Sequence, residues 1–328
     1  MSRMEPPSNV PTHPRVASRG RVPPCPVTGR ESRLIPASRA IVWLVAVAGP
    51  LGDLPQTQAN PRFADPKAKA IIEQYNEREV GAPGWRRVRI EMRTHGVLTR
   101  TFGIFNAWTA PEKTRTMLYY LETPEPLRGT RYLQEEQVEI GNDAAVYLFI
   151  PAGLRQVLVV DRNLHRQGLL GCDFSYADVR MTLPLQDCTV TTQGTTRLGQ
   201  VPVWKVSVET RTPDVKAPRS AFYYFTIDRP FLLGAEYFDT VAKASGAPTK
   251  TFRVEDYRDD GMVRTAIRMT MTGGEGRTTT IQLLELNLQI DPKGQGTLTS
   301  DGLKTIDDSF VAQWTGRPAD SPGQEAGK

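Results

Sequence analysis

Side chains able to do chemistry are few and scattered in this sequence. It contains no phosphate-binding glycine loop ending in Lys-Ser/Thr, no His-Glu-x-x-His pair and no Gly-x-Ser-x-Gly elbow. Beyond residue 59 the only histidines are His95 and His165, far apart along the chain. Two isolated histidines do not make a metal site. The sequence therefore predicts neither a metal nor another cofactor.

Asp173 and Asp178 are the acidic residues whose spacing could support acid and base catalysis, since they flank Phe174-Ser-Tyr176. Asp and Ser are also favoured at helix starts and in turns, and this second interpretation is the stronger one. We therefore expect a protein that is not an enzyme. Hydrolase activity is the weakest of its candidate functions.

An apolar run, residues 40–48, follows Arg39 and precedes the breaker pair Gly49-Pro50. It is about half as long as the ~20 apolar residues of a transmembrane helix, a length typical of a cleavable secretion signal. We expect residues 40–59 to form the signal and its cleavage region, with cleavage before Asn60 or, alternatively, after Ala48. A buried hydrophobic helix of an intracellular domain is the other interpretation. Export would make this a periplasmic protein of a bacterial envelope.

The three cysteines fit the same compartment. Cys25 precedes the signal, which leaves Cys172 and Cys188 in the mature chain. An even number of cysteines in an oxidising space predicts a disulfide between them. Two reduced, buried cysteines acting as small apolar side chains are the alternative. Neither cysteine follows an apolar run, so we expect no lipid anchor.

The basic character of the chain comes from its first 59 residues. The whole sequence has 41 Lys and Arg against 36 Asp and Glu, and residues 1–59 hold seven of the former and three of the latter. The remaining 34 and 33 nearly balance, which argues against nucleic acid as a partner. Ten of the 26 prolines also lie in residues 1–59, so we expect residues 1–39 to be a disordered lead. Translation that starts downstream of Met1 is an alternative.

Beyond the signal, the pattern is that of one helix followed by many strands. A capping Asp65, Pro66 at the first helical position and helical apolar spacing predict an amphipathic helix over 65–76. In residues 87–93 apolar side chains alternate with charges, which is typical of a strand with one wet face. Further β-like runs are expected at 99–108, 115–122, 130–139, 145–150, 156–161, 188–197, 201–210, 220–227, 231–238, 249–257, 262–272 and 277–290.

Turn signals at Gly194, Pro213-Asp214, Asp259-Asp-Gly261 and Gly273-Gly274 separate these runs and predict an antiparallel meander. So many twisted strands do not lie flat as one open sheet. We therefore expect a mainly β fold, a barrel or half-barrel whose opening or concave face the helix covers.

Three local features refine this expectation. Apolar residues change phase near Leu283, which predicts a bulge in the last strand. Residues 173–183 could add a short helix. We expect one β-domain over 60–316 and a disordered tail over 317–328, which is rich in Pro, Gly, Ala and Ser.

Residues 168–179 resemble the Gly-Ser-Asp-Phe-Ser-Tyr-Glu-Asp-Leu segment of bacterial outer-membrane lipoprotein-sorting proteins, which are related to the LolA and LolB carriers. Three further stretches, 126–133, 148–157 and 306–310, fit the same family in its order, so the resemblance spans about residues 63–315. Cys172 stands where the family pattern has Ser, which suggests a lineage-specific bridge to Cys188. The residues that carry the motif are Gly171, Asp173, Phe174, Ser175, Tyr176 and Asp178.

This resemblance implies an antiparallel, unclosed β-barrel with covering helices, whose apolar concave face accepts acyl chains. The expected partners are a lipid or lipoprotein acyl chain and a transport complex of the inner or outer membrane. The leading function is thus a carrier or chaperone for outer-membrane sorting or envelope transport. A non-carrier interaction or scaffold module of an envelope export complex is the alternative.

A carrier needs an apolar cavity, which alternate strand residues can line. Filling the core is the alternative role for the same side chains. The candidate liners are the bulky residues at spacing two and the apolar face of the helix: Ile71, Ile72, Tyr75, Phe102, Ile104, Met117, Tyr119, Val146, Leu148, Ile150, Trp204, Val206, Phe222 and Tyr224.

Overall fold

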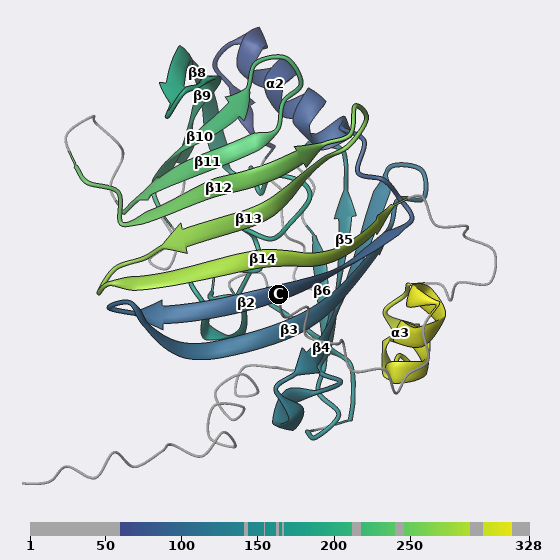
Figure 1. The fold of residues 1–328 in the computed structure, drawn as a ribbon. Coiled ribbons are helices and arrows are strands. Elements are labelled where there is room, and N and C mark those ends of the chain that lie inside the picture. Colours follow the sequence, from purple (N-terminus) through teal and green to yellow (C-terminus); the bar gives the residue numbers. More distant parts are fainter. Residues whose placement is uncertain are drawn as a thin grey trace, which may run out of the picture. The chain divides into compact units, whose positions relative to one another are not determined.

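Fourteen strands pair into one sheet in the described part of the chain, as seen in a computed structural model (Figure 1). The structure describes residues 60–140, 144–153, 155–161, 164–165, 167–211, 218–239, 246–288 and 298–316. The expectations for the lead, the signal, the Pro213-Asp214 turn and the tail lie outside these residues. The helices are α2 (Pro66–Glu77) and α3 (Asp308–Thr315), with 3-10 turns η1 (Glu125–Leu127), η3 (Leu169–Gly171) and η4 (Asp301–Lys304).

The expected meander is confirmed, because every neighbouring pair except β1 and β8 is antiparallel. The strand order is β1-β8-β9-β10-β11-β12-β13-β14-β2-β3-β4-β5-β6-β7, so the sheet is open, with the two-residue strands β1 and β7 at its edges. The strands are β1 (Arg62–Phe63), β2 (Gly84–Thr94), β3 (Val97–Thr109), β4 (Thr114–Thr123), β5 (Arg131–Gln137), β6 (Ala145–Phe149), β7 (Leu158–Val159), β8 (Cys188–Leu198), β9 (Val201–Thr210), β10 (Ser220–Thr226), β11 (Leu232–Phe238), β12 (Lys250–Asp259), β13 (Arg264–Thr272) and β14 (Arg277–Leu288).

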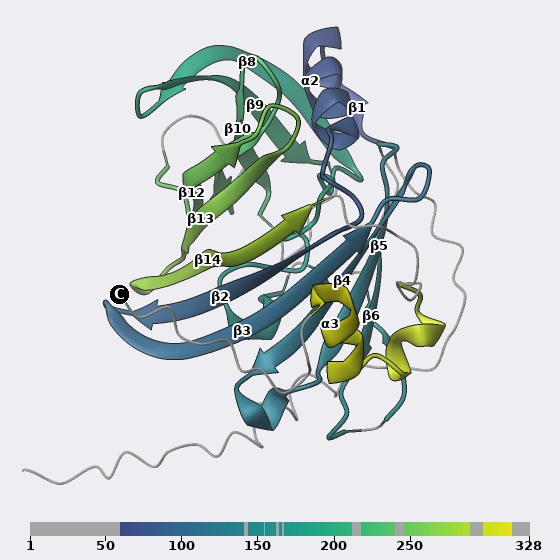
Figure 2. The ribbon, with the colours of Figure 1, turned by 45° about the vertical axis from the view of Figure 1, so that its right-hand side comes forward.

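The sheet curls (Figures 1 and 2). Its inner face carries the largest apolar cluster. Helix α2 packs on this inner face through Ile71, Ile72 and Tyr75. The helix begins where the sequence predicts. Asp65 caps it by accepting a hydrogen bond from the Ala68 amide at 2.7 Å, and Pro66 follows at the first helical position. The same carboxylate accepts hydrogen bonds from Thr192 on β8, so the cap also fixes the helix to the sheet.

The C-terminal segment covers the opposite, outer face of the sheet. There α3 lies across β4, β5 and β6 (Figure 2), and Trp314 and Val311 pack with Leu118 and Leu133. Polar contacts fix the segment as well, since the Tyr120 hydroxyl donates to Asp308 at 2.8 Å. Strands β4 and β5 are thus largely buried on both faces, as in a sandwiched sheet, whereas the outer face of β2 still carries the exposed Arg89.

The predicted bulge in the last strand is confirmed. The register between β14 and β2 shifts between Leu283 and Glu285, which leaves Leu284 unpaired and half-exposed. The turn expected at Gly194 is wrong, because Gly194 lies inside β8 at a register shift, with φ at +82°. That positive φ is the conformation glycine adopts at low cost, and a bulge uses it as readily as a turn does.

Two local expectations from the sequence differ from the structure. Residues 173–183 form turns and irregular backbone instead of a short helix. The predicted Cys172–Cys188 disulfide is also wrong, because both residues are buried thiols. Each sulfur donates to a nearby backbone carbonyl, Cys172 to Phe174 at 3.4 Å and Cys188 to Gln186 at 3.3 Å, so each satisfies its polar hydrogen locally.

Candidate functional site

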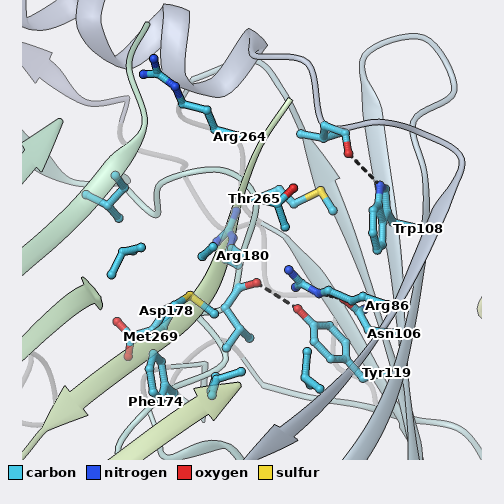
Figure 3. A pocket seen from close by; sticks show the side chains of 18 of the residues that line it. Arg86, Asn106, Trp108, Tyr119, Phe174, Asp178, Arg180, Arg264, Thr265 and Met269 are labelled. Carbon is cyan, nitrogen blue, oxygen red and sulfur yellow. Dashed lines mark hydrogen bonds between the residues drawn. The ribbon is translucent and has the colours of Figure 1, made fainter. Parts of the chain in front are cut away.

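A cavity of about 170 Å³ remains on the inner face of the sheet, beneath residues 168–185, a segment we call the strap (Figure 3). Its walls are mainly apolar. The sheet contributes side chains from β2, β3, β12, β13 and β14, α2 contributes Tyr75, and the strap contributes Phe174 and Met181. Because water gains little from such walls, the cavity favours an apolar guest.

Polar side chains on β4 and β5 hold one side of the strap to the inner face. The Tyr119 hydroxyl donates to the Val179 carbonyl at 2.9 Å, and Gln134 Nε2 donates to the Tyr176 carbonyl at 3.0 Å. Glu136, 1% exposed, accepts hydrogen bonds from the amides of Met181 and Thr182 at 3.2 and 2.9 Å. The strap has no regular strand pairing of its own. Side chains from the sheet therefore supply hydrogen-bond partners for its backbone N–H and C=O groups.

Two aspartates hold the other side of the strap. Asp173 accepts a hydrogen bond from the Thr279 hydroxyl on β14 at 2.9 Å. Asp178 receives Lys250 Nζ of β12 at 2.5 Å and the Tyr237 hydroxyl of β11 at 2.9 Å. Burial alone would raise the pKa of Asp178, but the Lys250 charge and the hydrogen bonds from Ser175 outweigh it and hold this pKa below its ordinary value.

Asp173 and Asp178 therefore serve as anchors of the strap in this structure. Asp178 also accepts hydrogen bonds from the Ser175 amide and hydroxyl, which is the turn role expected from the sequence. A carboxylate held ionised by a lysine is a poor general acid. The geometry gives no support to an acid and base pair.

The aromatic residues of the family motif fill the space between strap and sheet. Phe174 meets Phe252 edge to face with ring centroids 6.0 Å apart, and Tyr176 meets Tyr132 in the same way at 5.6 Å. Gly171 has φ at +77°, a conformation that lets the chain turn directly before the anchored stretch. The motif thus closes the strap over the inner face of the sheet: its aromatic rings point inward, and its two aspartates hold the strap to neighbouring strands.

A polar row crosses the inner face beside the cavity. Arg86 pairs in register with Asn106, Asn106 with Tyr119, and Tyr119 with Tyr132, across β2, β3, β4 and β5. Arg86 Nε donates to Asn106 Oδ1 at 2.8 Å, and Tyr119 stacks on Tyr132 with centroids 4.3 Å apart. Figure 3 shows Arg86 extending from the strands toward the part of the cavity where Arg180 lies.

The structure brings most of the predicted liners to the inner face. Tyr75, Ile104 and Tyr119 line the cavity itself. Trp204 packs against the inner cluster. The liners buried within that cluster are Ile71, Ile72, Phe102, Met117, Val146, Leu148, Ile150 and Val206.

Phe222 and Tyr224 do not join them. Their neighbours Tyr223 and Phe225 point inward, whereas Tyr224 belongs to a separate cluster with Val203, and Phe222 packs against it. Sequence reasoning also missed Arg86. A usable signal exists, since Arg86 stands two residues before Val88 and four before Ile90, in phase with the inward apolar residues of β2.

Neither histidine of the described part of the chain lines this cavity. Among the described residues, no group of three or more His, Cys, Asp and Glu side chains could hold a metal ion. His165 is buried, with Nε2 3.2 Å from the Val160 carbonyl, and His95 lies in the β2–β3 turn with φ at 50°. Among the same residues, no helix has the length and apolar character needed to cross a bilayer.

Several solved structures share this fold. A domain of an outer membrane lipoprotein-sorting protein from Vibrio parahaemolyticus matches with a TM-score of 0.57 and 16% identity, over 73% of this chain and 95% of that one. A DUF1329 family protein from Desulfovibrio piger matches with a TM-score of 0.56 and 14% identity, over 68% and 92%. A LolA superfamily protein from Nitrosomonas europaea matches with a TM-score of 0.51 and 15% identity, over 71% and 98%.

At these identities the structural matches show the fold alone, and their names indicate no catalytic family. No curated protein sequence matches the chain. A family model with the description "Uncharacterized protein" matches residues 113–294, more than half of the sequence. The chain belongs to that family, and its fold is LolA-like, as the resemblance of the strap motif implies.

Proposed function

We propose that this protein is a periplasmic, non-enzymatic carrier or chaperone that takes the acyl chain of a lipid or lipoprotein into the concave face beneath the strap. It would deliver this cargo for outer-membrane sorting or envelope transport, working with a transport complex of the inner or outer membrane. The observation that carries the proposal is the cavity itself: an apolar inner face closed by a tied strap instead of by a second sheet. The working protein would be the domain 60–316, released from a signal at 40–59.

Cargo entry would displace the strap, because the cavity of about 170 Å³ holds only part of a long chain. Four hydrogen bonds with the strap backbone hold its β4–β5 side: Tyr119 and Gln134 donate one each, and Glu136 accepts two. At ~1 kcal/mol net each they contribute ~4 kcal/mol, and burial of Phe174 and Tyr176 contributes about 5 kcal/mol more. A chain of about twelve methylenes gains ~10 kcal/mol on burial, at ~0.8 kcal/mol each. The two sums are close, so cargo could open the β4–β5 side of the strap while Asp173 and Asp178 keep the other side in place.

The test is to purify the protein from its native envelope under mild conditions and search for bound lipid by mass spectrometry. We expect an acylated molecule to co-purify, and stripped protein to take up a fluorescent fatty acid with saturation near one per chain. A protein that carries no lipid and takes up none would overturn the carrier function.

One observation favours the alternative, a scaffold module of an envelope export complex. The cavity of about 170 Å³ is smaller than the ~300–1,000 Å³ of most ligand pockets. Exposed apolar side chains also lie at two hairpin ends, Val97 and Leu98 at the start of β3 and Met262 between β12 and β13. The scaffold predicts no lipid uptake and a stable complex with an envelope protein, so the same purification separates the two functions.

A further inference from the structure

Arg86 is a charged residue on an apolar wall. It stands in phase with Val88 and Ile90 on β2, and its side chain lines the cavity. Its contacts are Asn106 Oδ1, which accepts from Nε, and the Trp108 ring, whose centroid lies 5.6 Å from the guanidinium carbon. No described carboxylate lies within ion-pair distance of it. Arg86 is partly withdrawn from water, and a charge in that position without a counter-ion is costly, so this arrangement needs a reason.

Tyr132 supplies a second, independent observation on the same wall. Its side chain is 1% exposed and lines the cavity, and its hydroxyl has no hydrogen-bond partner among the described residues. Burial and the neighbouring Tyr119 raise the pKa of Tyr132 well above its ordinary value, so the hydroxyl keeps its proton and remains a donor. Buried hydroxyls without a partner are rare in folded proteins.

The two donors belong to one row. Arg86 and Tyr132 end the series of register pairs that runs through Asn106 and Tyr119. Asn106 is fully buried, and its own amide donates to the Leu118 carbonyl at 2.7 Å, so Asn106 is held rigidly and aims the guanidinium. Because Asn106 occupies only Nε, the two terminal nitrogens of Arg86 can form a bidentate contact with an oxyanion.

The acidic side chains around the cavity are already engaged. Asp178 is paired with Lys250 at 2.5 Å, and Glu79 accepts hydrogen bonds from the amides of Val80 and Gly81. Burial lowers the pKa of Arg86, yet an arginine keeps its charge at neutral pH. The cavity therefore combines apolar walls with a positive charge that faces inward.

We infer that Arg86 and Tyr132 form a headgroup site for an anionic single-chain amphiphile, in which the guanidinium binds a carboxylate or phosphate and the hydroxyl donates to one of its oxygens. The inference rests on the proposed function, since it assigns the charged end of the acyl ligand to this wall. The chain would then run along the apolar side chains of Ile104 and Ile281, which line the same cavity.

The test compares three ligands of equal chain length on the full chain at pH 7.5: dodecanoate, dodecyl phosphate and dodecanol, each by calorimetric titration. We expect both anions to bind at least tenfold more tightly than the alcohol. The stronger of the two anions identifies the headgroup as carboxylate or phosphate. Inorganic phosphate without a chain should not bind measurably, because it gains nothing from the apolar walls.

Variants assign the preference to its residues. Arg86→Gln should reduce the anion affinity at least tenfold and leave dodecanol unchanged, and Arg86→Lys should retain part of the preference. Tyr132→Phe should reduce the anion affinity by a smaller factor than Arg86→Gln does. The matched control is Arg89→Gln, on the same strand but exposed on the outer face, which should behave as the wild type.

Two results would contradict these ideas in different ways. Equal affinity of the wild-type protein for the acid, the phosphate and the alcohol would overturn the headgroup site and keep the carrier. No binding of any of the three would overturn the carrier function itself. The wild-type comparison decides between them even if a variant does not fold.

Discussion

Lys250 Nζ lies 2.5 Å from Asp178 Oδ2 and joins the strap to the middle of the curled sheet. Both side chains are largely withdrawn from water, with 22% and 10% of their surface exposed. Removing one partner leaves the other charge uncompensated.

Lys250→Met should therefore destabilise the protein by about 2 kcal/mol, less than the ~3–5 kcal/mol of a fully buried pair because water still reaches Lys250. Urea unfolding measures this loss. Lys69→Met is the control, since Lys69 pairs with Glu73 on the exposed side of α2 and should cost less than ~0.5 kcal/mol. Equal losses for the two variants would mean that the strap pair contributes no more than a surface pair.

Asp178 should also make the stability of the protein sensitive to acid. Its native pKa lies below the ordinary value, whereas in the unfolded chain it is about 3.9. A lowered native pKa contributes stability above the unfolded pKa, and this contribution is lost as pH falls through the native value. Unfolding free energies measured from pH 6 to pH 3 should fall more steeply for the wild type than for Asp178→Asn. Parallel curves would show that Asp178 has an ordinary pKa in the folded protein.

Tyr119→Phe should loosen the strap without unfolding the sheet, because only the hydrogen bond to the Val179 carbonyl is lost. We expect a loss of about 1 kcal/mol, faster amide exchange at Met181 and Thr182, and faster uptake of a fluorescent fatty acid. Tyr120→Phe is the matched control on the outer face, where the hydroxyl bonds Asp308. That variant should loosen α3 and leave strap exchange unchanged, and the reverse pattern would contradict the proposed path of entry.

Helix α2 is held by apolar burial, so Ile72→Ala should cost about 2–5 kcal/mol. Ile72 is fully buried in the inner cluster. Gln74→Ala, on the exposed side of the same helix, should change stability by less than ~0.5 kcal/mol. Thermal and urea unfolding of both variants check this. A small effect of Ile72→Ala would mean that the helix rests only loosely on the sheet.

Cys172 of the strap and Cys188 of β8 should behave as free thiols. Burial raises the pKa of Cys172 to about 12, so its reactive thiolate is scarce at neutral pH. Alkylation followed by mass spectrometry should leave Cys172 unmodified in folded protein. After unfolding without reductant, both Cys172 and Cys188 should be modified. Protein that resists alkylation even when unfolded would restore the disulfide that the sequence favours.

The strands and the bulge were predictable because one face of each is apolar and period two is easy to read in residues such as Val88, Ile90 and Met92. Which residues of β10 point inward could not be predicted. Four successive residues are aromatic, Phe222, Tyr223, Tyr224 and Phe225, and both faces of the strand pack against apolar clusters. When both faces are apolar, alternation carries no information about direction.

The strap is the other limit of sequence reasoning. Its backbone is satisfied by side chains distant in sequence, such as Tyr119 and Glu136, and no local period predicts such contacts. The motif residues could be recognised, yet their anchoring roles follow only from their partners Thr279 and Lys250. Arg86 was missed because it lies directly before the alternating run 87–93, although its phase matches that of Val88 and Ile90.

An unclosed sheet has two edges, and exposed edges invite pairing with another chain. Here both outermost strands, Arg62–Phe63 and Leu158–Val159, are two residues long. Each presents too few backbone groups to act as a template for a further strand. The described edges of this open sheet thus give copies of the chain little opportunity to polymerise edge to edge.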